Sequence, residues 1–162
     1  MIDLFLEDQD PQKPPFMHCL STRAFDVKQV EQFCLQRGYG FYDIDIQDAC
    51  SREAMLDLFA ASMKFPAYFG RNWDAFVDLA SDLSWDKHPG YITVVENADR
   101  MLEFPRKDLT TFLAVCNAIT SRWQEEEDEY GNTVKPVSFH FLLVGSDAFC
   151  HQAGPLLNLP TQ

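Results

Sequence analysis

Residues 65–82 read FPAYFGRNWDAFVDLASD and contain the most regular helical pattern in the chain. From Asn72 to Ser84, apolar side chains recur at the three- and four-residue spacing of a buried helical face: Trp73, Phe76, Val77, Ala80 and Leu83. Asn72 can cap this helix, because its side chain can accept a hydrogen bond from the first turn. The preceding residues 64–71 contain proline and glycine, which favour a loop. The stretch therefore predicts an aromatic loop followed by a helix that packs inward.

The same predicted helix carries Asp74, Asp78 and Asp82, which stand four residues apart and so share one helical face. Like charges at this spacing repel each other, which suggests that the acidic face serves something other than folding. Tyr68 and Phe69 precede it in the loop and offer aromatic area to a partner. The combination predicts a surface that complements a cationic cleft, and the alternative interpretation is an ordinary solvated helix face.

The sequence on both sides of this motif alternates between strand and helix patterns. Strands are predicted at residues 16–20, 41–46, 90–96 and 137–144, and further helices at 26–38, 51–63 and 108–127. The run YITVV at 91–95 is typical of a strand that is covered on both faces of a parallel sheet. Helices between the strands imply right-handed crossovers. We therefore predict an α/β fold with a small parallel sheet flanked by helices.

Composition and charge limit the function. The chain has 162 residues, of which 46% are hydrophobic, and a formal net charge of -12. A chain of this length can bury one substantial core. An acidic surface repels phosphate backbones and anionic lipids, which argues against nucleic acid or a membrane as the partner and favours a basic protein. Residues 125–129 are five acids at the end of a predicted helix, where the helix dipole disfavours them unless a basic partner offsets their charge.

Targeting signals and cysteines indicate the compartment. No apolar run approaches the roughly 18 residues of a membrane span, and the start of the chain lacks the basic and apolar regions of a signal peptide. The five cysteines are widely spaced among mostly apolar neighbours, which predicts buried free thiols in a reducing compartment: Cys19, Cys34, Cys50, Cys116 and Cys150. We expect a cytoplasmic protein.

Candidate catalytic and metal sites are weaker. Asp43 and Asp45 project from one face of a predicted strand and could hold a hard cation, but no third carboxylate or glycine-rich phosphate loop accompanies them. A solvated strand face is the alternative interpretation. The four histidines form no recognisable catalytic motif with a serine or cysteine. We predict no catalytic residue, no metal site and no cofactor.

The loop and helix resemble those of the barstar family, intracellular inhibitors of barnase-type ribonucleases. The hallmark of this family is a loop of the form aliphatic-Pro-x-Tyr-Tyr-Gly-x-Asn followed by an Asp-containing helix, and here the motif stands as FPAYFGRNWDAF. The resemblance continues through GYITVVENAD, a helix from Leu109 and the terminal strand SFHFLLV, over about residues 40–145. The resemblance implies three parallel strands, and the predicted strand at 16–20 would add a fourth at the N-terminal edge of the sheet. It also implies a protein that inhibits a nuclease and catalyses no reaction itself.

The resemblance implies a partner-binding surface. Tyr68, Gly70 and Asn72 match the family's loop, and Asp74 and Asp78 match its two helix aspartates. Asp78 is the principal one, and its carboxylate would take the place of a substrate phosphate among cationic residues of the nuclease. With their neighbours in the loop and on the helix face, these residues form the predicted partner-binding set: Tyr68, Phe69, Gly70, Arg71, Asn72, Asp74, Asp78 and Asp82.

Several positions depart from the family pattern. Phe69 replaces the second loop tyrosine, the basic Arg71 follows the glycine, and Val77 stands where barstar has tryptophan. A further glutamate that the family offers from a later helix aligns near Asn117 or Ala118. The cognate nuclease can therefore differ from barnase itself.

The resemblance divides the chain into three parts and suggests a function. Residues 1–39 form an N-terminal extension of arm, strand and helix that packs on the core, residues 40–145 form the barstar-like domain, and residues 146–162 form a C-terminal tail. We expect an immunity protein that blocks the active site of a basic secreted ribonuclease or toxin domain. The alternatives are a barstar-like module for a non-nuclease partner and, less favoured, a metal enzyme built on Asp43 and Asp45.

Overall fold

A computed structural model describes residues 13–157, so most of the predicted N-terminal arm and residues 158–162 lie outside the described part. Four parallel strands form one sheet in the order β1-β4-β3-β2. Their bounds are Met17–Ser21 for β1, Gly40–Asp45 for β2, Gly90–Glu96 for β3 and Ser138–Gly145 for β4. The predicted α/β class is confirmed, including the extra N-terminal strand at one edge of the sheet.

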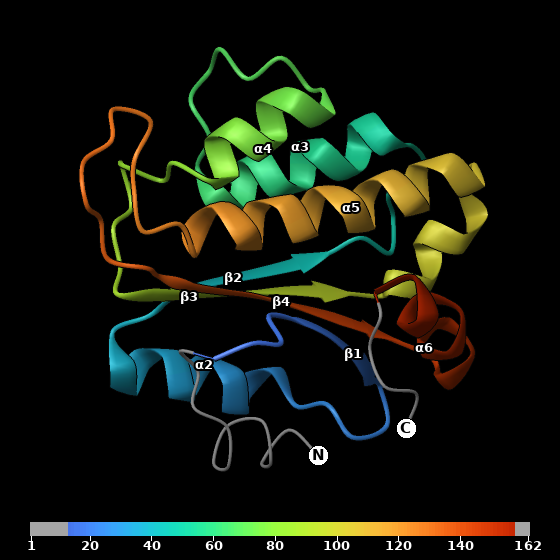
Figure 1. Cartoon of the computed structure of the whole chain (residues 1–162). Helices are drawn as coiled ribbons and strands as arrows, with labels where there is room; N and C mark the ends of the chain where they lie inside the picture. The colour runs from blue at the N-terminus through green and yellow to red at the C-terminus, as the bar shows by residue number, and fades with distance from the viewer. Residues whose placement is uncertain (1–12, 158–162) are drawn as a thin grey trace.

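Helices cover both faces of this sheet (Figure 1). One face carries α3 (Arg52–Met63), α4 (Trp73–Ala80) and α5 (Arg106–Trp123), and the other carries α2 (Val27–Arg37). A 3₁₀ helix η1 (Ala98–Glu103) follows β3, and α6 (Asp147–Ala153) and η2 (Gly154–Leu157) follow β4. The chain passes from β1 across to β2 through α2 on one face, and then returns through β3 to β4 with its helices on the other face. Right-handed crossovers that run in opposite directions across a sheet place their helices on opposite faces.

Two apolar clusters hold the layers together. The larger lies between the sheet and α3, α4 and α5, and it is rich in fully buried aromatic rings: Phe59, Phe76, Phe112, Phe139 and Phe141. The smaller lies on the other face, where Val30, Phe33 and Cys34 of α2 cover side chains of β3 and β4. Every residue of β4 is buried, as is every residue of β3 except Glu96. For β3 this confirms the prediction, made from the run at 91–95, of a strand covered on both faces.

The parts outside residues 40–145 are built onto the same sheet. β1 pairs with β4 from Met17 to Ser21, and α2 agrees with the helix predicted at 26–38, with Asp26 as its cap and Gly38 ending it in the left-handed conformation. In the segment predicted as a tail, α6 is capped by Ser146 and buries Phe149 completely. Both ends of the described chain therefore contribute to the core.

Two helices end earlier than predicted. α4 ends at Ala80 rather than Ser84, because the chain turns at Ser81 and Leu83 takes a positive φ of 44° while its side chain is fully buried. α5 ends at Trp123 rather than near residue 127, so the acids at 125–129 lie in the following loop and not against the end of a helix. The prediction of five buried thiols holds fully for Cys34 and Cys116; Cys19 and Cys150 are half-buried, and the prediction is wrong at Cys50, which is exposed.

Candidate functional site

The loop between α3 and α4 is held by its aromatic residues. α3 stops at Met63, and Lys64 takes the left-handed conformation. The helix could not continue far, because Phe65 directly precedes Pro66 and helical angles are disfavoured there. The Phe65 and Phe69 rings pack edge to face with centroids 5.1 Å apart, and the Phe69 amide donates to the Pro66 carbonyl at 3.0 Å. Tyr68 lies between these anchors with 78% of its surface exposed. The loop thus presents one large aromatic side chain to solvent.

Arg71 fixes the second half of the loop to α3. Its φ is 53°, a left-handed conformation that costs a non-glycine residue about 1 kcal/mol. A two-point ion pair holds the guanidinium in place, because Nε and Nη2 each lie 2.8 Å from a carboxylate oxygen of Asp57. Gly70 sits tightly beside it, since a Cβ there would lie 2.9 Å from the side-chain nitrogen of Asn72.

Asn72 and two aromatic residues position α4. The Asn72 Oδ1 atom accepts a hydrogen bond from the Ala75 amide at 2.9 Å, which confirms the predicted cap. Phe76 is fully buried, and the Trp73 ring packs between Phe76 and Phe112 with centroid distances of 6.4 and 6.2 Å. The inward face of the helix is therefore rigidly seated, and its outward face is held at a fixed orientation beside the loop.

The predicted row of three aspartates is only partly present. Asp74 and Asp78 lie exposed on α4, but Asp82 follows the end of the helix and accepts a hydrogen bond from the Ser84 hydroxyl at 3.3 Å. Asp78 is not isolated, because Nη1 of Arg122 on α5 lies 2.9 Å from its Oδ1 atom. The expected repulsion between Asp78 and its neighbours is therefore relieved by a cation that the spacing of the aspartates does not reveal.

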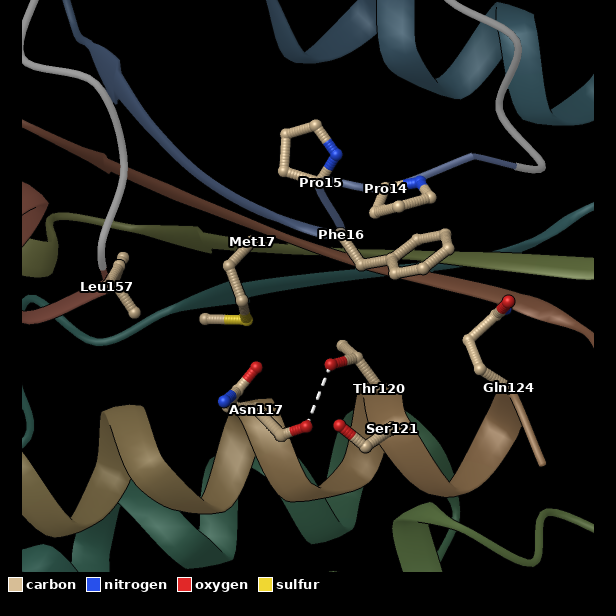
Figure 2. A pocket seen from close by; sticks show the side chains of 9 residues that line it. All are labelled: Pro14, Pro15, Phe16, Met17, Asn117, Thr120, Ser121, Gln124 and Leu157. Carbon is tan, nitrogen blue, oxygen red and sulfur yellow. Dashed lines mark hydrogen bonds between the residues drawn. The ribbon is translucent and has the colours of Figure 1, made fainter.

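The positions on α5 that align near the family's glutamate, Asn117 and Ala118, make no hydrogen bond with Asp78 among residues 13–157. Asn117 instead lines a groove of about 330 Å³ between α5 and the start of β1, together with Met17 and Thr120 (Figure 2). Ala118 is exposed and carries no polar group. The charged group that α5 contributes beside Asp78 is the guanidinium of Arg122.

Asp43 and Asp45, the carboxylates considered for a metal site, are engaged in hydrogen bonds and charge interactions with neighbouring residues. The Asp45 Oδ1 atom accepts hydrogen bonds from the Gln47 amide at 2.9 Å and from the Asn97 side chain at 2.7 Å. Partial burial raises the pKa of both Asp43 and Glu96, and the charges of neighbouring carboxylates raise both further, while a hydrogen bond with Glu96 works the other way on the pKa of Asp43. Within residues 13–157, no three His, Cys, Asp or Glu side chains come together in a group that could hold a metal ion.

Two polar networks escaped prediction because their members are distant in sequence. His18 on β1 and His140 on β4 meet at 3.2 Å, and burial, with the charge of His140, lowers the pKa of His18 to about 3. At the opposite edge of the sheet, the Tyr42 hydroxyl on β2 donates to Asp86 at 2.7 Å, and His88 lies 2.9 Å from the same carboxylate. Both networks join strands or loops of the fold, and neither lies in the loop or on α4.

Comparisons with known proteins agree with this fold. Among solved structures, the chain is similar to the ORC2 protein of Aeropyrum pernix, determined as ADPNP-ADP complexes, with a TM-score of 0.61 and 17% sequence identity. The match covers 96% of this chain but 42% of that protein, and at this identity it shows the fold alone. No curated protein matches, and none of the helices in residues 13–157 is both long and apolar enough to cross a membrane.

A family match identifies the chain more closely. Residues 39–135 match the family described as Barstar (barnase inhibitor), a segment that contains the loop, α4 and α5. It begins one residue before β2 and stops before β4. By this match over more than half of its length, the chain belongs to the barstar family.

Proposed function

We propose that this protein is an intracellular inhibitor, an immunity protein, that binds the active site of a basic barnase-type ribonuclease through the loop at 64–72 and the outer face of α4. The observation that supports this most is Tyr68, 78% exposed at the tip of a loop that is pinned on both sides. Next to it, Asp74 and Asp78 expose carboxylates on a helix whose inner face is fixed in the core. Aromatic and acidic groups in a rigid frame suit a cationic cleft.

The mode of inhibition follows from charge and rigidity. The carboxylate of Asp78 would take the position of a substrate phosphate, because arginine and lysine groups that bind phosphate also bind carboxylates. The pinned loop loses little conformational freedom on binding, so more of the contact energy appears as affinity. The net charge of -12 would draw a basic nuclease toward the chain before contact.

The residues of the proposed surface have different tasks. Tyr68, Asp74 and Asp78 would contact the partner directly, since their side chains are exposed. Phe69, Gly70, Arg71 and Asn72 would shape the loop, and Asp82 would add negative charge at the end of α4. No catalytic step is assigned to any of them, in keeping with an inhibitor family.

An inhibition assay tests this function. The purified chain is mixed with a panel of basic microbial ribonucleases, including barnase, and RNA cleavage and co-elution from a sizing column are followed. We expect inhibition of at least one nuclease at a stoichiometry of one to one, and a marked loss of inhibition in Tyr68→Ala. Tyr130→Ala is the matched control, because Tyr130 is equally exposed at 80% but lies in the loop after α5.

The second candidate is a binding module for a basic partner that is not a nuclease. The ion pair between Asp78 and Arg122 favours it, because it gives the surface a cation that a pure phosphate mimic does not need. Co-elution with a basic protein that has no ribonuclease activity, combined with no inhibition across the panel, would replace the first proposal with this one.

A further inference from the structure

Arg122 binds one of the two carboxylate oxygens of Asp78, the residue on which the proposed function rests. Its Nη1 atom donates to Asp78 Oδ1 at 2.9 Å, while Asp78 Oδ2 contacts no donor within residues 13–157. The two side chains come from different helices and are 48% and 70% exposed. An ion pair this exposed contributes little to stability. The guanidinium therefore has more consequence for what approaches Asp78 than for how the chain folds.

The pair changes the electrostatic field above α4. A cation that approaches the open oxygen of Asp78 is attracted by the carboxylate and repelled by the guanidinium beside it, so the net attraction is weaker than that of a lone carboxylate. Asp74, one turn earlier on the same helix, has no ion pair within the described residues and keeps its full charge. The surface is thus more negative at Asp74 than at Asp78, whose second carboxylate oxygen stays open.

Arg122 also limits which surfaces can close over it. Only one of its five N–H groups is used by Asp78, and the remainder are left unpaired when an interface excludes water. A partner that is cationic throughout offers them no acceptor and adds like-charge repulsion. A partner with a carboxylate or a carbonyl oxygen beside its cation satisfies both members of the pair. This is specificity by penalising the wrong partner.

We infer that Arg122 is a specificity-determining residue of this surface: it disfavours partners whose contacting site is cationic throughout and favours partners that place an acceptor beside the cation facing Asp78. This inference rests on the proposed function, since it assigns a role within the same interface. It explains how a chain with an acidic surface can select one basic protein among many.

Association kinetics with barnase as the cationic probe test the inference. Arg122→Ala is compared with Arg23→Ala, which makes the same charge change at an arginine that is 86% exposed on the turn between β1 and α2. We expect Arg122→Ala to raise the association rate constant roughly threefold to fivefold over the control at low salt, an effect that shrinks at physiological salt. Arg122→Gln, which keeps most of the side-chain stem, should behave in the same way.

The outcomes separate the inference from the proposed function. An Arg122→Ala chain that is folded by circular dichroism and associates no faster than Arg23→Ala, or does not bind, would overturn the role of Arg122. Adding Asp78→Ala to Arg122→Ala should abolish the gain. If the doubly substituted chain binds as well as Arg122→Ala, the contact does not involve Asp78, and the proposed binding surface itself fails.

Discussion

Phe33 is the best position to test whether the N-terminal extension is part of the fold. Its side chain is 8% exposed on the inner face of α2, its ring packs against Tyr39 with centroids 6.1 Å apart, and the Arg37 guanidinium lies 4.3 Å above it. Phe33→Ala leaves a cavity between α2 and the sheet. We expect the free energy of unfolding to fall by about 3–5 kcal/mol, a large part of the 5–15 kcal/mol that typical domains possess.

Urea unfolding followed by tryptophan fluorescence measures this loss. The three tryptophans pack against the larger apolar cluster, on the face of the sheet opposite α2. Their fluorescence therefore reports the global unfolding transition rather than a local change at the site of substitution. Leu35→Ala is the matched control, since Leu35 lies on the same helix but is 73% exposed. A Phe33→Ala chain within about 0.5 kcal/mol of Leu35→Ala, the range of ordinary surface changes, would refute the account of a packed extension.

Deletions extend the same argument. Removing residues 1–39 would uncover four fully or nearly fully buried sheet side chains: Ile92, Val94, Leu142 and Val144. At about 1.5–3 kcal/mol each, their exposure costs roughly 6–12 kcal/mol, comparable to the whole stability of a domain. We expect this chain to aggregate, whereas removal of residues 1–15 should leave the folded state intact, because Lys13, Pro14 and Pro15 are exposed.

Two further predictions concern pH and the loop. His18 has a folded pKa of about 3, below its ordinary value of 6.5, so the unfolded chain takes up a proton first as the pH falls. The free energy of unfolding should therefore decrease by up to about 1.4 kcal/mol per pH unit as the pH drops from 6.5 toward 3. Urea midpoints that depend on pH as steeply in His18→Gln as in the wild-type chain would contradict this. Asp57→Ala should weaken partner binding several-fold with little change in the urea midpoint. The reason is that the exposed pair with Arg71 orders the loop more than it stabilises the fold. Titration calorimetry that shows an unchanged affinity would refute the role of this ion pair in binding.

Local patterns predicted most of the fold. The β-branched run of β3, the Asn72 cap and the break before Pro66 each depend on a few neighbouring residues, and all three appear where expected. The end of α4 did not follow its pattern, because burial of Leu83 in the core required a turn that the helical spacing does not encode. Ser146 is a local signal for α6, since its hydroxyl caps the helix by accepting a hydrogen bond from the Phe149 amide, although the segment is predicted as a tail.

The binding surface was less predictable than the fold. The loop and the cap of α4 follow from residues within ten positions of one another. Arg122 and Asp78, by contrast, are 44 positions apart, and His18 and His140 are 122 apart. Such pairs form only when the tertiary fold brings their elements together, so no spacing rule could reveal them. The charge of the surface at Asp78 is thus a property of the assembled layers and not of the motif.

Calorimetric titration of Asp78→Ala against the nuclease that the wild-type chain inhibits tests the central claim most directly. Asp48→Ala, which removes an exposed aspartate after β2, is the control for net charge, and circular dichroism confirms that both chains fold. We predict that Asp78→Ala loses at least about 2 kcal/mol of binding free energy, because cationic groups of the partner are left unpaired, while Asp48→Ala changes little. A loss below about 0.5 kcal/mol, no larger than an ordinary surface substitution, would contradict the claim that Asp78 acts as a phosphate mimic.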